Sequence, residues 1–451
     1  MKNFVGYGRR DITPTEPQPL AGFGNCEQRM VNQIVLDPLY ATCIAISDES
    51  GSTVLIFTTD LIHHGDRSIV GIREAIEKEL GIPGNRVMIQ GTHTHSAPDI
   101  WSSSMDCIIR YYEQQVIPQC LLAAKEALAD RAEAELYYGS VETENLNFVK
   151  HYQHTTPEGE VKYFGDNFGT AVYDETTRHI TDADPTMHLL KIVRPGKKDI
   201  IMANWRAHAT LTGGLKKPEV SADFPGAFRK VMEEKLDCLF AFHQGAAGNL
   251  NASTRLREKE ERTRDYKLHG QYLAEHALQG LKNLKKLPSG AVRIMNYTLM
   301  GKVDHSEDYR VEDARKVVDV WTKTSDYAAV REVAAPLGIR SPYKATSILR
   351  RFSKPQEEPL ELNTITVGEE LAFVTAPNEL FDTISVMVED ASPYAHTLTL
   401  GYCNAYRGYI PSKLGYEYTC YESDATWFEA GIGEIIAQTF TDMLKEMKEE
   451  A

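Results

Sequence analysis

The chain has 451 residues, 42% of them hydrophobic and 25% charged, and a formal net charge of −15. This length allows a large buried core, in one big domain or two ordinary ones. The acidic balance argues against nucleic acid or an anionic membrane as partner, because both select basic surfaces. The first residues show no apolar stretch followed by a small-residue cleavage site, so we expect no secretory leader. The sequence also has no apolar run of the roughly 20 residues that a membrane span needs. The seven scattered cysteines form no CxxC pair and indicate reduced thiols, so we expect a cytoplasmic protein.

The first hundred residues alternate between strand and helix patterns. Two β-branched, apolar stretches separated by the turn "DESG" predict a hairpin over 40–47 and 52–61. The apolar spacing over 66–85 predicts a helix that stops at Gly81 and Pro83. A short buried strand is then expected over 86–93, so that the motif "GTHTHSAPD" (91–99) lies where a strand gives way to a loop.

The remaining chain repeats this arrangement of strands that lead into polar loops. Further strands are predicted over 199–210, 238–251 and 370–381, and helices over 256–286, 311–333 and 432–449. The stretch 288–350 looks mostly helical and is expected to form a lid or subsidiary lobe. No linker divides the chain, so we predict one α/β domain over 1–451. It would have mixed β-sheets flanked by helices and a site on loops at strand ends.

Two histidines stand one residue apart in "GTHTHSAPD". In an extended segment His93 and His95 project to the same side and can reach one point. Imidazole suits zinc, and a catalytic zinc takes about three protein ligands plus an open position. The other strand ends offer His208 and Glu379. Carboxylates that could orient the histidines follow nearby strands, at Asp60, Asp99 and Asp223. An isolated HxH is also common without metal, so spacing alone leaves that alternative open.

Seven motifs, in order along the chain, resemble those of the neutral ceramidase family. They are "GYGRRDITPTEPQPLAGFG" (6–24), "THTHSAPD", "NWRAHAT", "SADFPG" (221–226), "GAAGNLN", "PNEL" and "GYCNAYRGYIPSKLGYEYTCYE" (401–422). The glycine-rich "GAAGN" lacks the lysine of a phosphate-binding P-loop and the third glycine of a dinucleotide fingerprint. The resemblance implies a mononuclear zinc amide hydrolase, with an N-acylated sphingoid base as the family-default substrate.

The resemblance also assigns roles to individual residues. It implies one Zn²⁺ per chain, held by His93, His208, Glu379 and Tyr409, with Mn²⁺ or Fe²⁺ as other metals that suit these ligands. His95 matches the active-site histidine that carries the proton, and Tyr421 a tyrosine that faces the reacting centre. The loop residues Gly245, Gly248 and Asn249, together with Tyr409, are expected to stabilise the oxyanion.

Two positions depart from the family pattern. Asn251 stands where the family has a proposed serine nucleophile, with Ser253 two residues on, and Phe148 stands where it has an arginine, with Lys150 and His151 nearby. Attack by zinc-bound water is therefore expected, with Asn251 able to hydrogen-bond the substrate. The sequence ends in a charged helical pattern, so we expect no C-terminal immunoglobulin-like domain of the kind that the long secreted ceramidases carry.

Two alternatives to a ceramidase stay open. One is a zinc hydrolase of a small polar amide or ester, and the other is an inactive metal-binding relative that serves as a binding protein. Ceramide needs an apolar groove, expected over 100–115 and 288–350, where a Trp101–Ile108–Tyr111 stripe is as compatible with core as with groove. The partner is expected to be a small-molecule amide, with no nucleic acid and no integral membrane; the oligomeric state is not encoded in these patterns.

Overall fold

A large mixed sheet forms the centre of the molecule. The computed structural model describes residues 1–23, 26–100, 104–165, 173–214, 217–254, 256, 265–418 and 420–450. Within those ranges the main sheet has nine strands. In spatial order they are β14 (Leu239–Gln244), β12 (Ile200–Trp205), β11 (Thr186–Val193), β6 (Ala132–Glu142), β1 (Asn3–Asp11), β3 (Tyr40–Asp48), β4 (Thr53–Thr59) and β5 (Val87–Gly91), with β16 (Lys285–Lys286) beside β6.

A second sheet of four strands and several short strand pairs complete the β-structure of the described residues. The second sheet runs β17 (Val292–Lys302), β18 (Glu357–Val367), β19 (Leu371–Thr375) and β21 (His396–Leu400). The short elements are β2 (Ile34–Val35) with β13 (Glu219–Val220), β7 (Phe148–Val149) with β15 (Leu250–Asn251), β20 (Glu379–Leu380) with β22 (Tyr409–Ile410), and β8 (His151–Thr155) with β9 (Val161–Gly165) and β10 (Arg178–His179).

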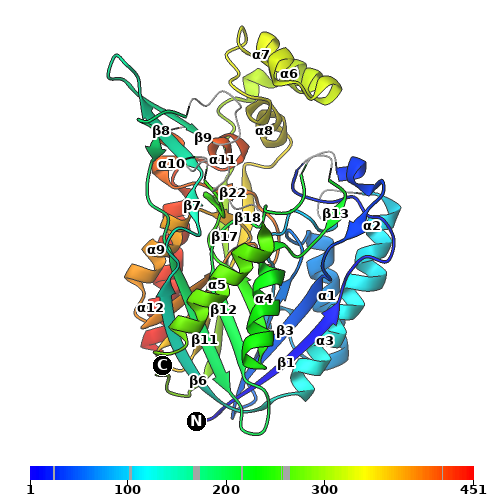
Figure 1. Ribbon diagram of the computed structural model, residues 1–451, viewed down its shortest axis with the longest axis vertical. Helices are drawn as coiled ribbons and strands as arrows, with labels where there is room; N and C mark the ends of the chain where they lie inside the picture. Colours follow the sequence, from blue (N-terminus) through cyan, green and yellow to red (C-terminus); the bar gives the residue numbers. More distant parts are fainter. Residues whose placement is uncertain are drawn as a thin grey trace.

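Helices cover both outer faces of the paired sheets (Figure 1). On the main sheet lie α1 (Asp66–Leu80), α2 (Asp106–Tyr111), α3 (Ile117–Ala129), α4 (Asp223–Leu236) and α5 (Tyr266–Gly280). On the second sheet lie α9 (Asp382–Ala391) and α12 (Ile432–Glu449). The short helices α10 (Lys413–Glu417) and α11 (Tyr421–Ala425) and the lobe formed by α6 (Val311–Thr324), α7 (Tyr327–Ala334) and α8 (Pro342–Phe352) lie at the end opposite both termini (Figure 1).

The alternation of side chains along the strands builds this layered arrangement. In β3, Ala41, Cys43 and Ala45 pack with α1 and α3, whereas Ile44 and Ile46 pack with strands of the second sheet. Successive strand residues point to opposite faces, so a strand buried on both sides is apolar throughout. Full burial of one such aliphatic side chain contributes about 1.5–3 kcal/mol. The helical lobe has a small apolar cluster of its own, which includes Val317, Val330 and Ile348.

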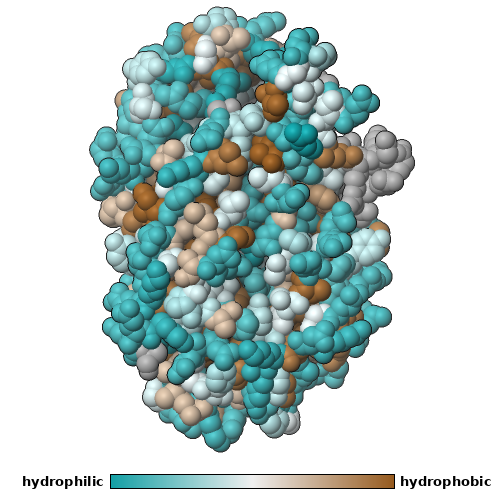
Figure 2. All heavy atoms as spheres, turned by 90° about the vertical axis from the view of Figure 1, so that its left-hand side faces the viewer, coloured by the Kyte–Doolittle hydropathy of each residue, from teal (hydrophilic) through white to brown (hydrophobic). Residues whose placement is uncertain are grey.

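The face formed by α9 and α12 is mostly hydrophilic, with scattered apolar side chains such as Met387 and Ile435 (Figure 2). No helix in the described ranges is long and apolar enough to cross a bilayer.

Most of the expected elements are present. The hairpin is β3–β4, and the helix expected over 66–85 is α1, which ends at Gly81 with a left-handed φ of 69°. The helix predicted over 311–333 is broken at Ser325 into α6 and α7, and α12 matches its predicted range. Of the helix predicted over 256–286, α5 covers the central part, and residues 255 and 257–264 lie outside the described ranges, as does Trp101.

Two sequence predictions are wrong in part. The stretch 288–350 is helical over much of its length, in α6, α7 and α8, but its beginning is not, because residues Val292–Lys302 form β17, an edge strand of the second sheet. Its side chains are only partly buried, so its apolar alternation is weak. The strand predicted over 86–93 ends at Gly91, and His93 has a φ of 65°, which is not extended backbone.

Candidate metal centre

Four chain segments bring candidate ligands to one end of the sheets. His93 and His95 follow β5, His208 follows β12, and Glu379 and Tyr409 begin β20 and β22. Backbone bridges pair Thr94 with Ala209 and His208 with Asn251, and Glu379 lies opposite Tyr409 in the parallel β20–β22 pair. The carboxyl ends of neighbouring parallel strands meet at one edge, and these bridges tie the loops beyond that edge together.

The possible ligand atom of each of these residues lies within hydrogen-bond distance of that of at least one other residue. Oε2 of Glu379 is 3.2 Å from Nε2 of His93 and 3.1 Å from Nε2 of His208. Nε2 of His95 lies 3.3 Å from Nε2 of His93, and the Tyr409 hydroxyl lies 3.4 Å from Nε2 of His208. His93, His208 and Glu379 are at most 3% exposed. The structure thus brings together all five residues that the sequence singled out as metal ligands or proton carrier.

His93 reaches this position by a backbone conformation that the sequence analysis did not foresee. Its left-handed φ of 65° is held by an N–H donated to Leu61 O at 3.0 Å, while His95 donates its N–H to Ala209 O at 3.0 Å. A non-glycine residue in this region costs on the order of 1–3 kcal/mol and persists when the surroundings impose it. The two rings therefore converge through a turn, not through an extended strand.

The buried polar atoms fit a metal cation. Nδ1 of His93 lies 3.0 Å from Ile62 O, and Nδ1 of His208 lies 2.8 Å from Ala247 O and 3.0 Å from Leu250 O. A carbonyl only accepts, so each Nδ1 carries the proton and each Nε2 presents a lone pair toward Glu379. Oε2 of Glu379 is buried and has no hydrogen bond with correct geometry among the described residues. Lone pairs on two nitrogens and one carboxylate oxygen therefore face each other and repel. A cation bound between them would turn this repulsion into three attractive contacts.

The pKa values of His208, His95 and Glu379 are shifted in the directions that suit metal ligands. Burial lowers the pKa of His208 to about 4 and holds the pKa of His95 well below its ordinary value. Burial alone would raise the pKa of Glu379, but positive charge at His93 and His208 lowers it well below its usual range. A metal cation bound between these groups would supply that charge in place of ring protons. Neutral imidazoles around one carboxylate form a donor set that suits zinc. The ligand atoms of His93, His95 and His208 also lie within 4.8 Å of one another, so His95 is geometrically a further candidate ligand.

Three aromatic residues that the sequence did not reveal support the candidate ligands. Tyr406 donates its hydroxyl to Oε1 of Glu379 at 2.6 Å, which leaves Oε2 facing the histidines. Its ring stacks on His63 at 3.8 Å, and Tyr402 stacks on His93 at 4.0 Å. The tyrosine-rich stretch 401–422 was the available signal, but many tyrosines there are compatible with simple packing.

The expected carboxylate partners of the histidines are wrong in two cases. Asp60 forms an ion pair with Arg229 at 2.9 Å, and Asp223 accepts from the backbone and side chain of Thr212 at 2.6 and 2.7 Å. Backbone carbonyls orient His93 and His208 instead. Asp99 is buried, and its backbone N–H is donated to Pro19 O at 2.9 Å.

The expected oxyanion loop is also corrected. The backbone N–H of Gly245 donates to Trp205 O at 2.7 Å and that of Gly248 to Leu380 O at 2.8 Å. The Asn249 side chain donates to Asp382 at 2.8 Å and accepts from the Asp382 backbone at 2.9 Å. The Gly248 and Asn249 contacts hold β20 and α9 in place, and the Gly245 contact ties the loop to the end of β12. These N–H groups are thus used within the protein and are not aimed at the reacting centre.

The two departures from the family pattern lie opposite one another. Asn251 in β15 pairs with Phe148 in β7, and Asn251 also bridges to His208. Lys150 and His151 follow directly; both contact Glu422, at 2.8 and 2.6 Å, and the Lys150 ammonium lies 5.3 Å from the centre of the Tyr409 ring. The changes are thus confined to one strand pair beside His208.

Comparison with known proteins defines the fold. No protein-family model and no curated relative matches the chain. Among solved structures, neutral ceramidase from Pseudomonas aeruginosa matches over 100% of this chain and 75% of its own, with a TM-score of 0.74 and 17% identity. A ceramidase complexed with C2 matches over 100% of this chain and 76% of its own, with a TM-score of 0.70 and 18% identity. The chain has the neutral ceramidase fold. The resemblance seen in the motifs and the predicted α/β class are confirmed at this level.

Proposed function

We propose that the chain is a zinc-dependent hydrolase of a linear amide bond, of the neutral ceramidase type. The observation that carries the proposal is the convergence of two Nε2 lone pairs and one free carboxylate oxygen, within 3.1 and 3.2 Å, in a buried site. His93, His208, Glu379 and Tyr409 are the proposed ligands of one zinc ion per chain. Zinc bound there would polarise an amide carbonyl and make water nucleophilic at neutral pH.

The side chains around the ligands supply proton transfer and oxyanion stabilisation. His95 takes a proton from the attacking water and gives it to the leaving nitrogen, so amide and water become acid and amine. Such a transfer contributes roughly a hundred- to ten-thousandfold. The Tyr421 ring lies 5.6 Å from that of Tyr409. Burial raises the pKa of Tyr421, so its hydroxyl stays protonated and is the proposed donor to the oxyanion, a role worth about 3–4 kcal/mol.

The substrate class is the less constrained part of the proposal. An N-acylated sphingoid base is the family-default substrate. Ile108 and Tyr111, which the sequence left open between core and groove, are buried in the core beside α1 and α3. The concentration of changes at Asn251 and Phe148 favours, as a second candidate, a smaller polar amide or ester. The cytoplasmic location and single-domain organisation stay predictions.

A combined metal and turnover experiment tests this function. Elemental analysis of the purified chain is paired with mass spectrometry of its products from short-chain ceramide, simple N-acyl amines and N-acetyl sugars, with and without chelator. We expect about one zinc per chain and chelator-sensitive release of an amine. The His93→Ala variant should lose its zinc, while His276→Ala, which alters a partly exposed histidine of α5, should keep it.

Each outcome discriminates between the candidates. Sphingosine release identifies a ceramidase, and turnover of polar amides alone identifies the second candidate. Zinc without any turnover supports a binding protein, and a His93→Ala variant that retains its zinc contradicts the proposed centre.

A further inference from the structure

Helix α11 lies between the candidate centre and the helical lobe. Its first residue, Tyr421, packs edge-on against Tyr409 on one side, at 5.6 Å, and against Tyr343 of α8 on the other, at 4.8 Å. Tyr343 in turn shares a hydrogen bond of 2.6 Å with Tyr327 of α7. The position of Tyr421 therefore depends on where the lobe lies.

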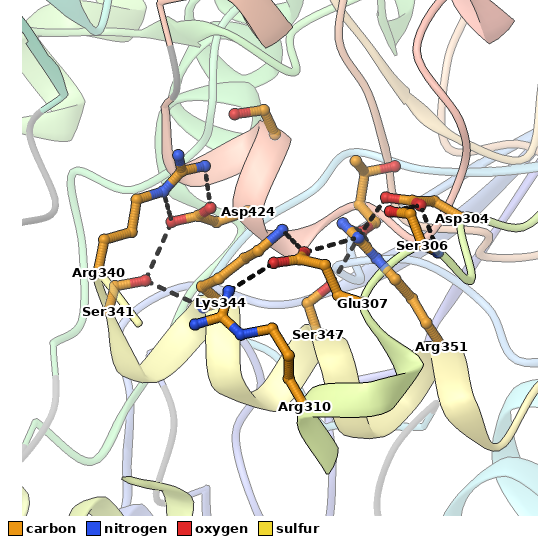
Figure 3. Close-up of polar contacts among 12 residues, drawn as sticks. Asp304, Ser306, Glu307, Arg310, Arg340, Ser341, Lys344, Ser347, Arg351 and Asp424 are labelled. Carbon is orange, nitrogen blue, oxygen red and sulfur yellow. Dashed lines mark hydrogen bonds and ion pairs between the residues drawn. The ribbon is translucent and has the colours of Figure 1, made fainter. Parts of the chain in front are cut away.

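Asp424, on the same short helix, connects it to the lobe by hydrogen bonds (Figure 3). Its carboxylate is fully buried and accepts from both Nε and Nη2 of Arg340, the former at 2.9 Å, and from Oγ of Ser341 at 3.0 Å. Ser341 also caps the first turn of α8 by accepting from the backbone N–H of Lys344 at 3.0 Å. One carboxylate thus fixes α11 to the start of α8 by paired, charge-assisted hydrogen bonds.

A second set of hydrogen bonds to the lobe is formed at Thr426. Its carbonyl accepts from Ser347 Oγ at 2.9 Å and from Nε and Nη2 of Arg351 at 3.1 and 2.9 Å. The Thr426 hydroxyl donates to Tyr409 O at 2.8 Å. The segment 421–426 is therefore bound to α8 on one side and to the proposed ligand Tyr409 on the other.

Ion pairs inside the lobe brace α8 itself (Figure 3). Glu307 contacts Lys344 and accepts from Arg310 at 2.8 Å, and Asp304 accepts from Arg351 at 2.5 Å. Arg310 also donates to Leu337 O and Gly338 O, at 2.9 and 2.8 Å. These contacts stabilise the lobe, and Arg310 has no contact with α11 among those found in the described residues.

We propose that Asp424 is a positioning residue, which holds Tyr421 against Tyr409 by tying α11 to the helical lobe. The inference rests on the proposed function for its effect on catalysis, but its structural part is independent of any substrate. On this proposal the helical lobe helps to form the reacting centre and is more than a lid over it.

The experiment compares Asp424→Asn with Arg310→Met, which removes an ion pair of the same kind inside the lobe. Hydrogen exchange of the metal-loaded protein is measured peptide by peptide. Asp424→Asn should raise exchange at least about tenfold in residues 420–426 and 409–410, and Arg310→Met only within the lobe. Arg340→Lys keeps the charge but loses the two-pronged geometry, and should act in the same direction if Asp424→Asn fails to fold.

Kinetics supply the second measurement. With any amide that the wild type hydrolyses, Asp424→Asn should lower kcat at least about tenfold with little change in KM, and should have no further effect in a Tyr421→Phe background. Unchanged exchange at 409–426, or additive effects of the two substitutions, would overturn the inference. A wild type without turnover would count against the proposed function alone, and the exchange result would still decide the role of Asp424.

Discussion

At the scale of single residues, the candidate centre depends on which oxygen of Glu379 is left for a cation. Tyr406 occupies Oε1 with a 2.6 Å hydrogen bond, so Oε2 alone faces the Nε2 atoms of His93 and His208. A hydrogen-bond partner of this kind orients the metal ligand, and its removal commonly lowers metal affinity roughly 10- to 100-fold.

Removing that hydroxyl gives a direct test. Tyr406→Phe keeps the ring that stacks on His63 but frees Oε1, and we expect zinc affinity to fall roughly 10- to 100-fold. Competition with a chromophoric chelator measures it. Tyr402→Phe is the matched control, because the buried Tyr402 hydroxyl has no hydrogen-bond partner among the described residues while its ring stacks on His93. Equal affinity of Tyr406→Phe and wild type would contradict the assigned role.

At the scale of elements, the glycine-rich loop acts as a spacer behind Glu379. A Cβ on Gly248 would lie 2.4 Å from Glu379 O and 2.8 Å from Leu380 O, which are backbone atoms of β20. A Cβ on Gly245 would meet the Arg206 side chain at 3.1 Å and Trp205 O at 3.4 Å, a tighter than usual but tolerable fit. The closeness of the loop to β20 thus requires glycine at position 248 far more than at 245.

This difference predicts unequal effects of two alanine substitutions. Gly248→Ala should push β20 away and move Glu379, lowering zinc affinity at least about tenfold and stability by about 1–3 kcal/mol. Gly245→Ala should leave zinc affinity near that of the wild type. Chelator competition and urea unfolding measure both quantities. A Gly248→Ala protein that binds zinc normally would show that β20 does not need this close contact.

The elements also explain what the sequence could and could not predict. The β3–β4 hairpin, α1 and the strand-end placement of His93 and His208 follow from local periodicity and turn residues, which the sequence displays directly. The contacts of Tyr406 with Glu379 and His63 join three segments that no spacing rule connects. The left-handed His93 was missed because histidine, unlike glycine, does not signal that conformation. Asp60 was assigned to the wrong partner because its neighbour Arg229 comes from α4, 169 residues away.

At the scale of the whole molecule, stability should depend on histidines buried far from solvent. Burial lowers the pKa of His64, His243 and His269 to about 3 in each case. In the unfolded chain each has a pKa of about 6.5. These residues stay neutral in the folded chain, whereas the unfolded chain takes up a proton at each of them below about pH 6.5. Their contribution to the unfolding free energy is therefore fully present above about pH 6.5 and is lost as the pH falls toward 3. Burial raises the pKa of Asp223 to about 6. The folded chain therefore binds a proton at this residue before the unfolded chain does, and Asp223 adds to the unfolding free energy as the pH falls below about 6.

His269 allows this pH dependence to be isolated. Its ring packs against Trp205 and Phe224, and its buried Nε2 has no hydrogen bond within the described part of the chain. His269→Phe removes one proton-binding site but keeps an aromatic ring, and any packing strain is the same at both pH values. Between pH 7 and pH 5 the wild type should lose about 2 kcal/mol more unfolding free energy than the variant, since the unfolded chain binds one proton that the folded chain excludes. Urea unfolding at the two pH values measures the difference. Equal losses in the two proteins would mean that His269 takes up its proton in the folded state, and that its surroundings admit charge despite the apolar rings on two sides.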